Sequence, residues 1–152
     1  MTVLKLHSEP LRDEWLDDYG HLNDGFYAVA FGNAAWPLLD HFGLGLEYFE
    51  RTGGALYTVE SHIRYLKEVR PPAMLEMDSM VLGSDAKRFH FAHVMMVDGV
   101  ERATFECMNL HFDSNAGRTA PMPEDVQAAL KATEMAEPPD WAGRGISLKP
   151  KS

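Results

Sequence analysis

The sequence has one cysteine, few basic residues and no long apolar run. Cys107 alone cannot form an internal disulfide. Lys and Arg number 14 against 23 Asp and Glu, a net charge of −9, and they are scattered, which argues against a nucleic-acid-binding surface. The longest stretch without a charge, Gly25 to Leu39, contains Gly32 and Pro37 and is shorter than the ~20 apolar residues that cross a membrane. We therefore expect neither nucleic acid nor a membrane as a partner.

The length and composition favour one compact domain. The chain has 152 residues, of which 45% are hydrophobic and 24% charged. We expect a single domain over residues 1–136, including a C-terminal helix that starts near Pro123, and an extended tail over residues 137–152. The first ten residues lack the features of a signal peptide, so the expected compartment is the cytoplasm.

A long helix is predicted after residue 23. Asn23 and Asp24 are good N-caps, and the apolar side chains that follow leave no broad polar face before Gly43. Such a helix must be wrapped by protein. Pro37 is expected to kink or divide it, and a short second helix is expected over about residues 46–52.

The hydrophobic period changes to two after residue 55, which predicts strands. In the first strand Tyr57, Val59, Ile63 and Tyr65 are expected on one face, and Thr58, Glu60, His62 and Arg64 on the other. Further strands are expected over residues 74–82, 87–97 and 100–112, and a short one over residues 11–16. This order predicts an α+β fold in which a curved antiparallel sheet wraps around one long central helix. Its unpaired edges favour a homodimer.

Chemistry-bearing residues crowd into the turn before the long helix. Asp17, Gly20, His21 and Asn23 lie there, and the unpaired first-turn N–H groups of the helix suit a carbonyl oxygen that gains negative charge. A nearby carboxylate would supply the attack. The same side chains also suit a turn and a helix cap without chemistry, and the residues alone leave both readings open.

The pattern Asp-x-x-Gly-His-x-Asn at residues 17–23, followed by an aromatic-rich helix, resembles the hotdog-fold acyl-CoA thioesterases of the 4-hydroxybenzoyl-CoA thioesterase type. Residues 15–21, 57–64, 82–88 and 111–123 are similar to the thioesterases associated with carnitine dehydrogenase. The resemblance implies a hotdog fold, hydrolysis of betainyl-CoA and a role in carnitine metabolism. The sequence departs from the pattern at Asp24, where many relatives have a second Asn, and at Asp18, an additional carboxylate.

The resemblance also implies roles for residues. Asp17 is expected to act as general base or as nucleophile, with His21 and Asn23 orienting the loop or the substrate. The oxyanion site is expected at the helix N-terminus, near Gly25, Phe26 and Tyr27. The expected acyl-group contacts are the aromatic residues Trp15, Tyr19, Tyr27, Phe31 and Trp36, which suit a quaternary ammonium group, and Glu60, His62 and Arg64 from a partner chain.

Few other groups are expected to take part. Lys67, Lys87 and Arg88 are candidates for contacts to the phosphates of coenzyme A, which enters only as part of the substrate; no other cofactor is expected. No metal site is predicted, since His90 and His93 fall on opposite faces of a strand. Cys107 is expected to be a packed thiol. Two alternatives remain open: an acyl-thioester hydratase or dehydratase, and a non-catalytic protein that binds an acyl thioester or betaine.

Overall fold

The computed structural model describes residues 2–148. Strand β1 (Leu4–Pro10) and a short 3-10 helix, η1 (Asp13–Trp15), precede the helices α1 (Asp24–His41) and α2 (Leu46–Thr52). The next elements are β2 (Gly54–Tyr65), β3 (Met74–Ser84), β4 (Arg88–Val97), β5 (Val100–Asp113), β6 (Arg118–Thr119) and α3 (Glu124–Thr133). No helix in this part of the chain is long and apolar enough to cross a membrane.

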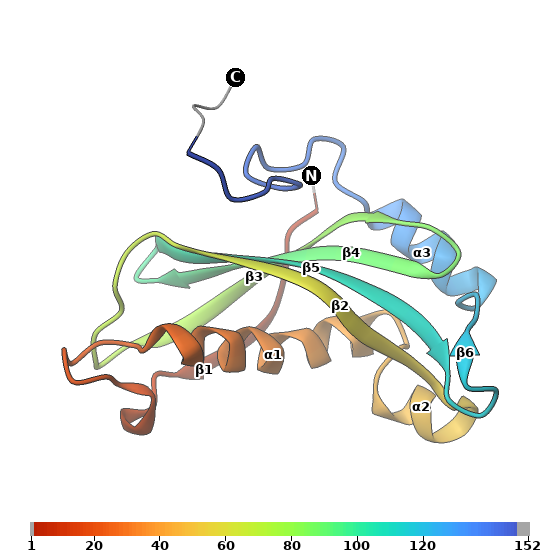
Figure 1. The fold of residues 1–152 in the computed structure, drawn as a ribbon, viewed down its shortest axis with the longest axis horizontal. Coiled ribbons are helices and arrows are strands. Elements are labelled where there is room, and N and C mark those ends of the chain that lie inside the picture. Colours follow the sequence, from red (N-terminus) through yellow and green to blue (C-terminus); the bar gives the residue numbers. More distant parts are fainter. Residues whose placement is uncertain (1, 149–152) are drawn as a thin grey trace.

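The strands form one antiparallel sheet in the order β1-β3-β4-β5-β2, with β6 paired to β5. The sheet curves over α1, which lies against its inner face (Figure 1). This confirms the predicted α+β fold with a curved sheet around one long helix. The two edge strands are β1 and β2.

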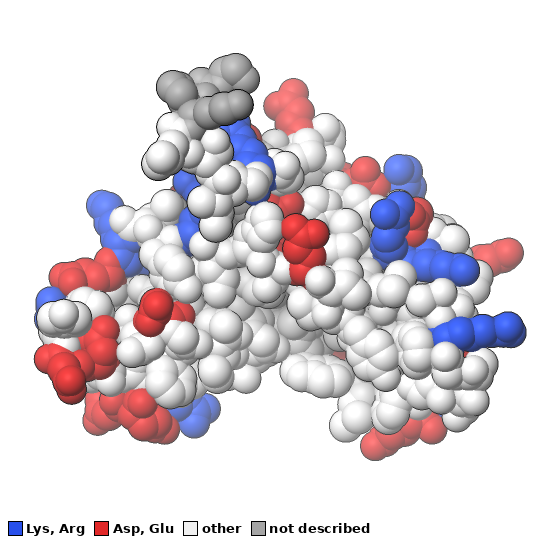
Figure 2. Space-filling view, viewed as in Figure 1, with Lys and Arg blue, Asp and Glu red and all other residues white. Residues whose placement is uncertain are grey.

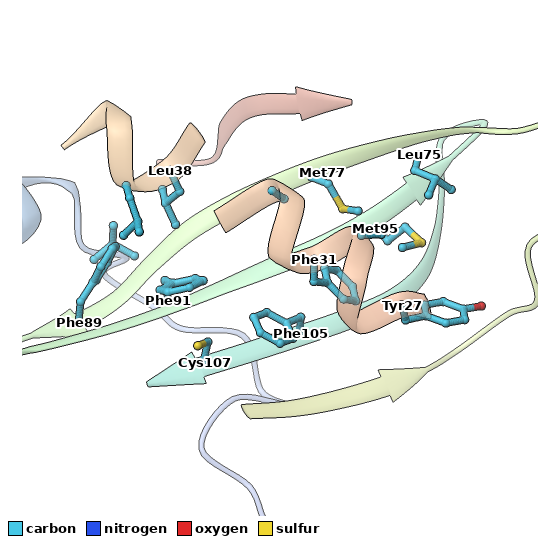
Figure 3. Packing of buried hydrophobic residues seen from close by; sticks show 14 of the residues in the cluster. Tyr27, Phe31, Leu38, Leu75, Met77, Phe89, Phe91, Met95, Phe105 and Cys107 are labelled. Carbon is cyan, nitrogen blue, oxygen red and sulfur yellow. The ribbon is translucent and has the colours of Figure 1, made fainter. Parts of the chain in front are cut away.

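The core lies between α1 and the inner face of the sheet. Phe31 of α1 is fully buried and stacks on Phe105 of β5, with ring centroids 5.1 Å apart. Figure 3 shows the aromatic and methionine side chains of the neighbouring strands around this helix face. The α1 residues buried in this core are Tyr27, Ala30, Phe31, Ala34, Leu38 and Leu39.

The outward face of α1 is not covered by the rest of the chain. Val29 is 44% exposed and Trp36 54% exposed. The expectation that the helix is wrapped on all sides is therefore wrong within one chain. Of the two outcomes predicted for Pro37, division of the helix is wrong, because α1 continues through it to His41, whereas a kink stays a prediction. The buried Leu38 and Leu39 anchor the turn beyond the proline, which offsets the loss of one backbone hydrogen bond.

Two strand predictions need correction. The strand before α1 is Leu4–Pro10, paired with β3, whereas the predicted strand at residues 11–16 contains η1. The polar run from Arg12 to Glu14 has no alternating pattern, and the Trp15 N–H donates to the Arg12 carbonyl in a tight turn. In β2 the register shifts between Thr58 and Glu60.

This register shift is a β-bulge that inserts one residue and exchanges the faces before it. The Thr58 hydroxyl donates to the buried Asn109 at 3.1 Å, on the core side, where Ile63 also packs. Tyr57 instead packs on Phe112, with ring centroids 5.2 Å apart. The predicted faces of Tyr57 and Thr58 are therefore reversed relative to the rest of β2.

The residues after α3 fold back across the outer face of the sheet, opposite α1 (Figure 1). Trp141 and Ala142 pack on an apolar cluster of this face, and the Glu106 carboxylate accepts the Gly143 N–H at 2.8 Å. Residues 137–148 contain no helix or strand, as expected of a tail, but they are folded against the sheet. Residues 149–152 of the expected tail lie outside the described residues.

A histidine is buried at the centre of the core. The His93 ring lies nearly parallel to those of Phe31 and Phe105, with centroids 6.2 Å and 5.9 Å away, and its Nδ1 lies 2.8 Å from the Ser79 hydroxyl. Its Nε2 has no hydrogen-bond partner in the described part of the chain. Burial, with a smaller repulsion from His7, lowers the pKa of His93 to about 3, so the ring is neutral at physiological pH.

The buried His93 predicts a loss of stability in mild acid. Below about pH 6.5 the unfolded chain binds a proton at this histidine while the native state, with a pKa of about 3, does not. The free energy of unfolding should fall by about 2 kcal/mol between about pH 7.5 and about pH 5 from this group. Urea denaturation measures it, with His93→Leu/Ser79→Ala as the comparison; parallel pH curves for the two proteins would contradict the assignment.

Candidate functional site

A closed loop positions the predicted site residues just before α1. The Asn23 N–H donates to the Trp15 carbonyl at 2.9 Å, and the Asp17 N–H donates to the His21 carbonyl at 3.0 Å. Gly20 adopts φ of 82°, a left-handed conformation that favours glycine, and its N–H donates to the Asp17 carbonyl at 3.0 Å. The loop therefore has its own backbone bonds, and Asp17 and His21 face each other across its base.

The Asp17 carboxylate is held in place and remains accessible. Its Oδ1 accepts hydrogen bonds from two backbone N–H groups, that of Tyr19 at 2.9 Å and that of His21 at 3.5 Å. Its Oδ2 lies 3.3 Å from His21 Nδ1, and the side chain is 19% exposed. A carboxylate with this mixture of fixed partners and access to solvent can act on a bound molecule as base or nucleophile.

A pocket of about 390 Å³ opens beside this carboxylate. It lies between the loop, the start of α1 and the segment that follows β2. The residues that line it are Asp17, Tyr19, His21, Leu22, Asp24, Tyr27, Tyr65, Leu66, Lys67 and Glu68. The structure thus brings together Asp17, His21, Tyr19, Tyr27 and Lys67 among the predicted site residues.

The first turn of α1 is partly capped. The Asn23 side chain accepts the Gly25 N–H at 2.9 Å, and the Phe26 N–H donates to the Asn23 carbonyl at 3.0 Å. Asn23 is therefore the N-cap of α1, and two of the predicted oxyanion donors already have acceptors. In the described part of the chain the Asp24 N–H has no acceptor, and Asp24 and Tyr27 both line the pocket.

The aromatic residues divide between the pocket and the core. Tyr19 and Tyr27 line the pocket, and their contact with an acyl group stays a prediction. Trp15 is buried and stacks on Phe26, with ring centroids 6.2 Å apart, and Phe31 lies in the core. Trp36 is on the outward face of α1. Trp15, Phe31 and Trp36 therefore lie outside this pocket in one chain. For Phe31 and Trp36 the reason is that successive residues of a helix point to different faces.

Two pocket residues with functional side chains, Tyr65 and Glu68, were not predicted as site residues from the sequence. Tyr65 contacts Tyr27 edge to face at 5.0 Å, and its hydroxyl donates to the Asp24 carbonyl at 3.3 Å. Glu68 lies 3.7 Å from His21 Nε2, and its other oxygen accepts from Arg70 at 2.9 Å. The available signal was the polar stretch directly after a strand, where loops often carry functional groups.

Negative charge surrounds the pocket. Burial, followed by the neighbouring Tyr65, raises the pKa of Tyr27, and burial followed by Asp24 raises the pKa of Tyr65. The hydrogen bond from Arg70 lowers the pKa of Glu68, which is therefore ionised at neutral pH. Figure 2 shows acidic side chains gathered at the end of the molecule where α1 begins. This setting favours a cationic group.

Glu60, His62 and Arg64 lie on the outer face of the sheet, away from the pocket in the same chain. His62 Nε2 lies 3.0 Å from a Glu60 oxygen and its Nδ1 lies 3.1 Å from the Arg144 carbonyl of the tail. The Arg64 guanidinium lies over the Trp141 ring at 5.9 Å. A contribution of these residues to a site in a second chain stays a prediction.

The basic candidates are also separated. Lys67 lines the pocket. Lys87 and Arg88 lie at the turn between β3 and β4, at the opposite end of the sheet (Figure 1), where Arg88 pairs with Asp85 at 2.6 Å. The fold of one chain therefore does not bring the three cations together, and a joint contact to one ligand stays a prediction.

The remaining reactive groups are placed in structural contacts. Burial raises the pKa of the Cys107 thiol, and its sulfur contacts Thr58 and Asn109, as expected of a packed thiol. His90 points outward to Glu106 at 2.6 Å, and His93 points into the core. Within residues 2–148, no three His, Cys, Asp or Glu side chains gather closely enough to hold a metal ion.

Comparison with known proteins identifies the family of this chain. Residues 11–130 match the thioesterase-like superfamily. A betainyl-CoA thioesterase from Pseudomonas aeruginosa is 35% identical over 154 residues, which cover 97% of each chain. An L-carnitine dehydrogenase/betainyl-CoA thioesterase from Agrobacterium fabrum is 40% identical over 147 residues, covering 94% of this chain and 30% of that protein. The chain thus spans under a third of that longer relative.

Solved structures show the same fold. A candidate thioesterase from Pseudomonas putida KT2440 superimposes with a TM-score of 0.81 at 31% identity, covering 99% of both chains. A hypothetical protein from Staphylococcus aureus, solved in complex with CoA, has a TM-score of 0.86 at 22% identity and covers 98% of both chains. The second likeness shows the fold alone.

The left-handed Gly20 predicts a specific sensitivity of the loop. Gly20→Ala should lower the free energy of unfolding by about 1 kcal/mol or more, because L side chains disfavour this conformation. Its new Cβ would also lie 3.4 Å from the Arg70 guanidinium. Gly83→Ala is the control, since Gly83 has neither a positive φ nor an atom within 4 Å of the added Cβ. Equal urea midpoints for the two variants would contradict this reading.

Proposed function

The chain belongs to the thioesterase-like superfamily, and we propose that it hydrolyses an acyl-CoA thioester to a free acid and CoA, with betainyl-CoA as its substrate. The observation that carries the proposal is the match to a betainyl-CoA thioesterase along 97% of both chains. A carboxylate at the mouth of a pocket, directly before the central helix of a hotdog fold, supplies the chemistry. No relative named here is a hydratase or a pure binding protein.

Asp17 is proposed as the group that starts the reaction. As a general base it takes a proton from water, whose oxygen attacks the thioester carbon. As a nucleophile it attacks that carbon itself and forms a mixed anhydride, which water then cleaves. Both routes end with the carboxylate regenerated, the C–S bond broken and the CoA sulfur protonated. His21, 3.3 Å from Oδ2, orients the carboxylate in either route.

The start of α1 is proposed to stabilise the oxyanion. The attack places negative charge on the former carbonyl oxygen, and a helix N-terminus carries partial positive charge. Because the Gly25 and Phe26 N–H groups already bond to Asn23, the Asp24 N–H beside the pocket is proposed as a donor to this oxygen. Hydrolysis of a thioester is not a redox reaction, so the proposed reaction uses only water and the CoA thioester.

The proposed compartment is the cytoplasm, because its reducing conditions suit the lone thiol of Cys107.

We propose that the protein forms a homodimer, in which a second copy covers surface that one chain leaves exposed. Edge strand β2 pairs on one side alone, with β5, and exposes the apolar side chains of Tyr57 and Val59. The outward face of α1 adds the exposed Val29 and Trp36. Unpaired strand edges and exposed apolar surface are both features that a second copy would cover. The dimer would also give Glu60, His62 and Arg64 the chance to approach a second pocket.

The proposed chemistry predicts that Asp17→Asn lowers kcat for betainyl-CoA by at least ~100-fold, because an amide of the same shape neither accepts a proton nor attacks the thioester. Release of free thiol from CoA measures the rate. Asp18→Asn is the matched control, since Asp18 is an exposed neighbour outside the pocket. An Asp17→Asn enzyme that retains the parent rate would exclude this role.

The proposed dimer predicts a mass of at least twice 17.1 kDa in light scattering. Val59→Lys should shift the protein toward the monomer, because a buried lysine disfavours pairing at the β2 edge. Val3→Lys places the same charge on an exposed valine beside β1, the other edge, and should leave the mass unchanged. A dimer that is lost in Val3→Lys and kept in Val59→Lys would place the interface at the β1 edge and contradict the proposed interface at β2.

A further inference from the structure

Building on the proposed function, we propose that Tyr19, Tyr27, Tyr65 and Glu68 form a binding site for the quaternary ammonium group of the acyl chain. Two of these residues, Tyr65 and Glu68, come from the end of β2 and the segment after it, far from Asp17 in the sequence. The site replaces the expected contribution of Trp15, Phe31 and Trp36, which face elsewhere in the chain.

The aromatic part of the site offers ring faces to a cation. Tyr27 and Tyr65 meet edge to face at 5.0 Å, and the hydrogen bond from Tyr65 to the Asp24 carbonyl holds that ring in the pocket wall. Tyr65 is 52% exposed and Tyr19 80% exposed, so both rings have surface available to a ligand. A trimethylammonium group has no N–H to donate, and aromatic faces with carboxylates nearby are the surfaces that bind it.

The charged part of the site is arranged around these rings. The carboxylates of Asp17, Asp24 and Glu68 line the pocket with one cation, Lys67. Arg70 bonds both Glu68 and the Tyr19 carbonyl, which holds the Glu68 segment against the loop. Burial is the main cause of the raised pKa values of Tyr27 and Tyr65, and the carboxylates of Glu68 and Asp17 near Tyr27, and of Asp24 near Tyr65, add smaller contributions.

The position of the site matches the length of the substrate. In a betainyl group one methylene separates the nitrogen from the thioester carbon, so a cation site must lie within a few ångströms of the attacking carboxylate. In this pocket the imidazole ring of His21 lies between the carboxylates of Asp17 and Glu68. His21 Nδ1 lies 3.3 Å from Asp17, and its Nε2 lies 3.7 Å from Glu68. A cation beside Glu68 and Tyr65 therefore leaves the carbonyl within reach of Asp17.

The kinetic test compares betainyl-CoA with its uncharged isostere, 3,3-dimethylbutyryl-CoA, in which carbon replaces nitrogen. The parent enzyme should prefer the charged substrate in kcat/KM. Tyr65→Leu should reduce this preference by about 5- to 10-fold, whereas Tyr65→Phe, which keeps the ring face, should retain most of it. Glu68→Gln should reduce it by about 2- to 5-fold, and more at low salt. Glu47→Gln, at an equally ion-paired surface glutamate, is its control.

A binding test separates this site from the proposed activity. Tetramethylammonium chloride, titrated by NMR against the intact protein, should shift resonances of the pocket at millimolar concentration, whereas ammonium chloride at equal ionic strength should not. Tyr65→Leu should weaken that binding by about 5-fold or more. This measurement needs no turnover, so it stands even if neither thioester is cleaved, a result that would overturn the proposed function alone.

Two results would overturn the ammonium site. In the first, Tyr65→Leu lowers kcat/KM equally for both substrates, which would make Tyr65 a general wall of the pocket. In the second, tetramethylammonium produces no shifts in the parent protein beyond those of ammonium chloride. A loss of preference that Tyr65→Phe rescues, together with binding that depends on Tyr65, would support the site.

Discussion

The packing of α1 on the inner face of the sheet is the constraint on which the site depends. Phe31 lies between the helix and Phe105 of β5, and the buried side chains along the same face fix both the rotation and the position of α1. The N-terminus of the helix is thereby placed at the end of the sheet where β2 ends, near Tyr65. Because the core is closely packed, it gives the first turn one position relative to Tyr65 and Glu68.

The loop before α1 holds the Asp17 carboxylate in a fixed position relative to the start of the helix. Its backbone bonds tie Trp15 to Asn23 and Asp17 to His21, and the Leu22 N–H donates to the Val69 carbonyl, which joins the loop to the segment after β2. The Asn23 cap joins it to the helix. Asp17 is thus positioned by three neighbouring elements at once, a form of preorganisation that sites on flexible loops lack.

The acidic character of the chain acquires a local meaning in this arrangement. A net charge of −9 repels the phosphates of coenzyme A at long range, yet carboxylates gathered around one pocket favour a cationic acyl group. Three basic side chains lie near that pocket, Lys67, Arg70 and Arg102. Arg70 is paired with the Glu68 carboxylate, and Arg102 donates to the Glu68 carbonyl at 2.7 Å. The distribution of charge favours recognition of the acyl end of the substrate over its nucleotide end.

The sequence by itself determined what depends on neighbouring residues: the long helix with its Asn23 cap, the strands β2 to β5 with their turns, and the loop that carries Asp17 and His21. Local propensity and hydrophobic period are sufficient for such features. The tertiary structure alone decided which aromatic rings reach the pocket. Trp15 and Phe31 are buried while Tyr65 lines the pocket, because burial depends on contacts between segments far apart in sequence. The bulge in β2 has the same origin, since one inserted residue reverses the face of Tyr57 through its pairing with β5.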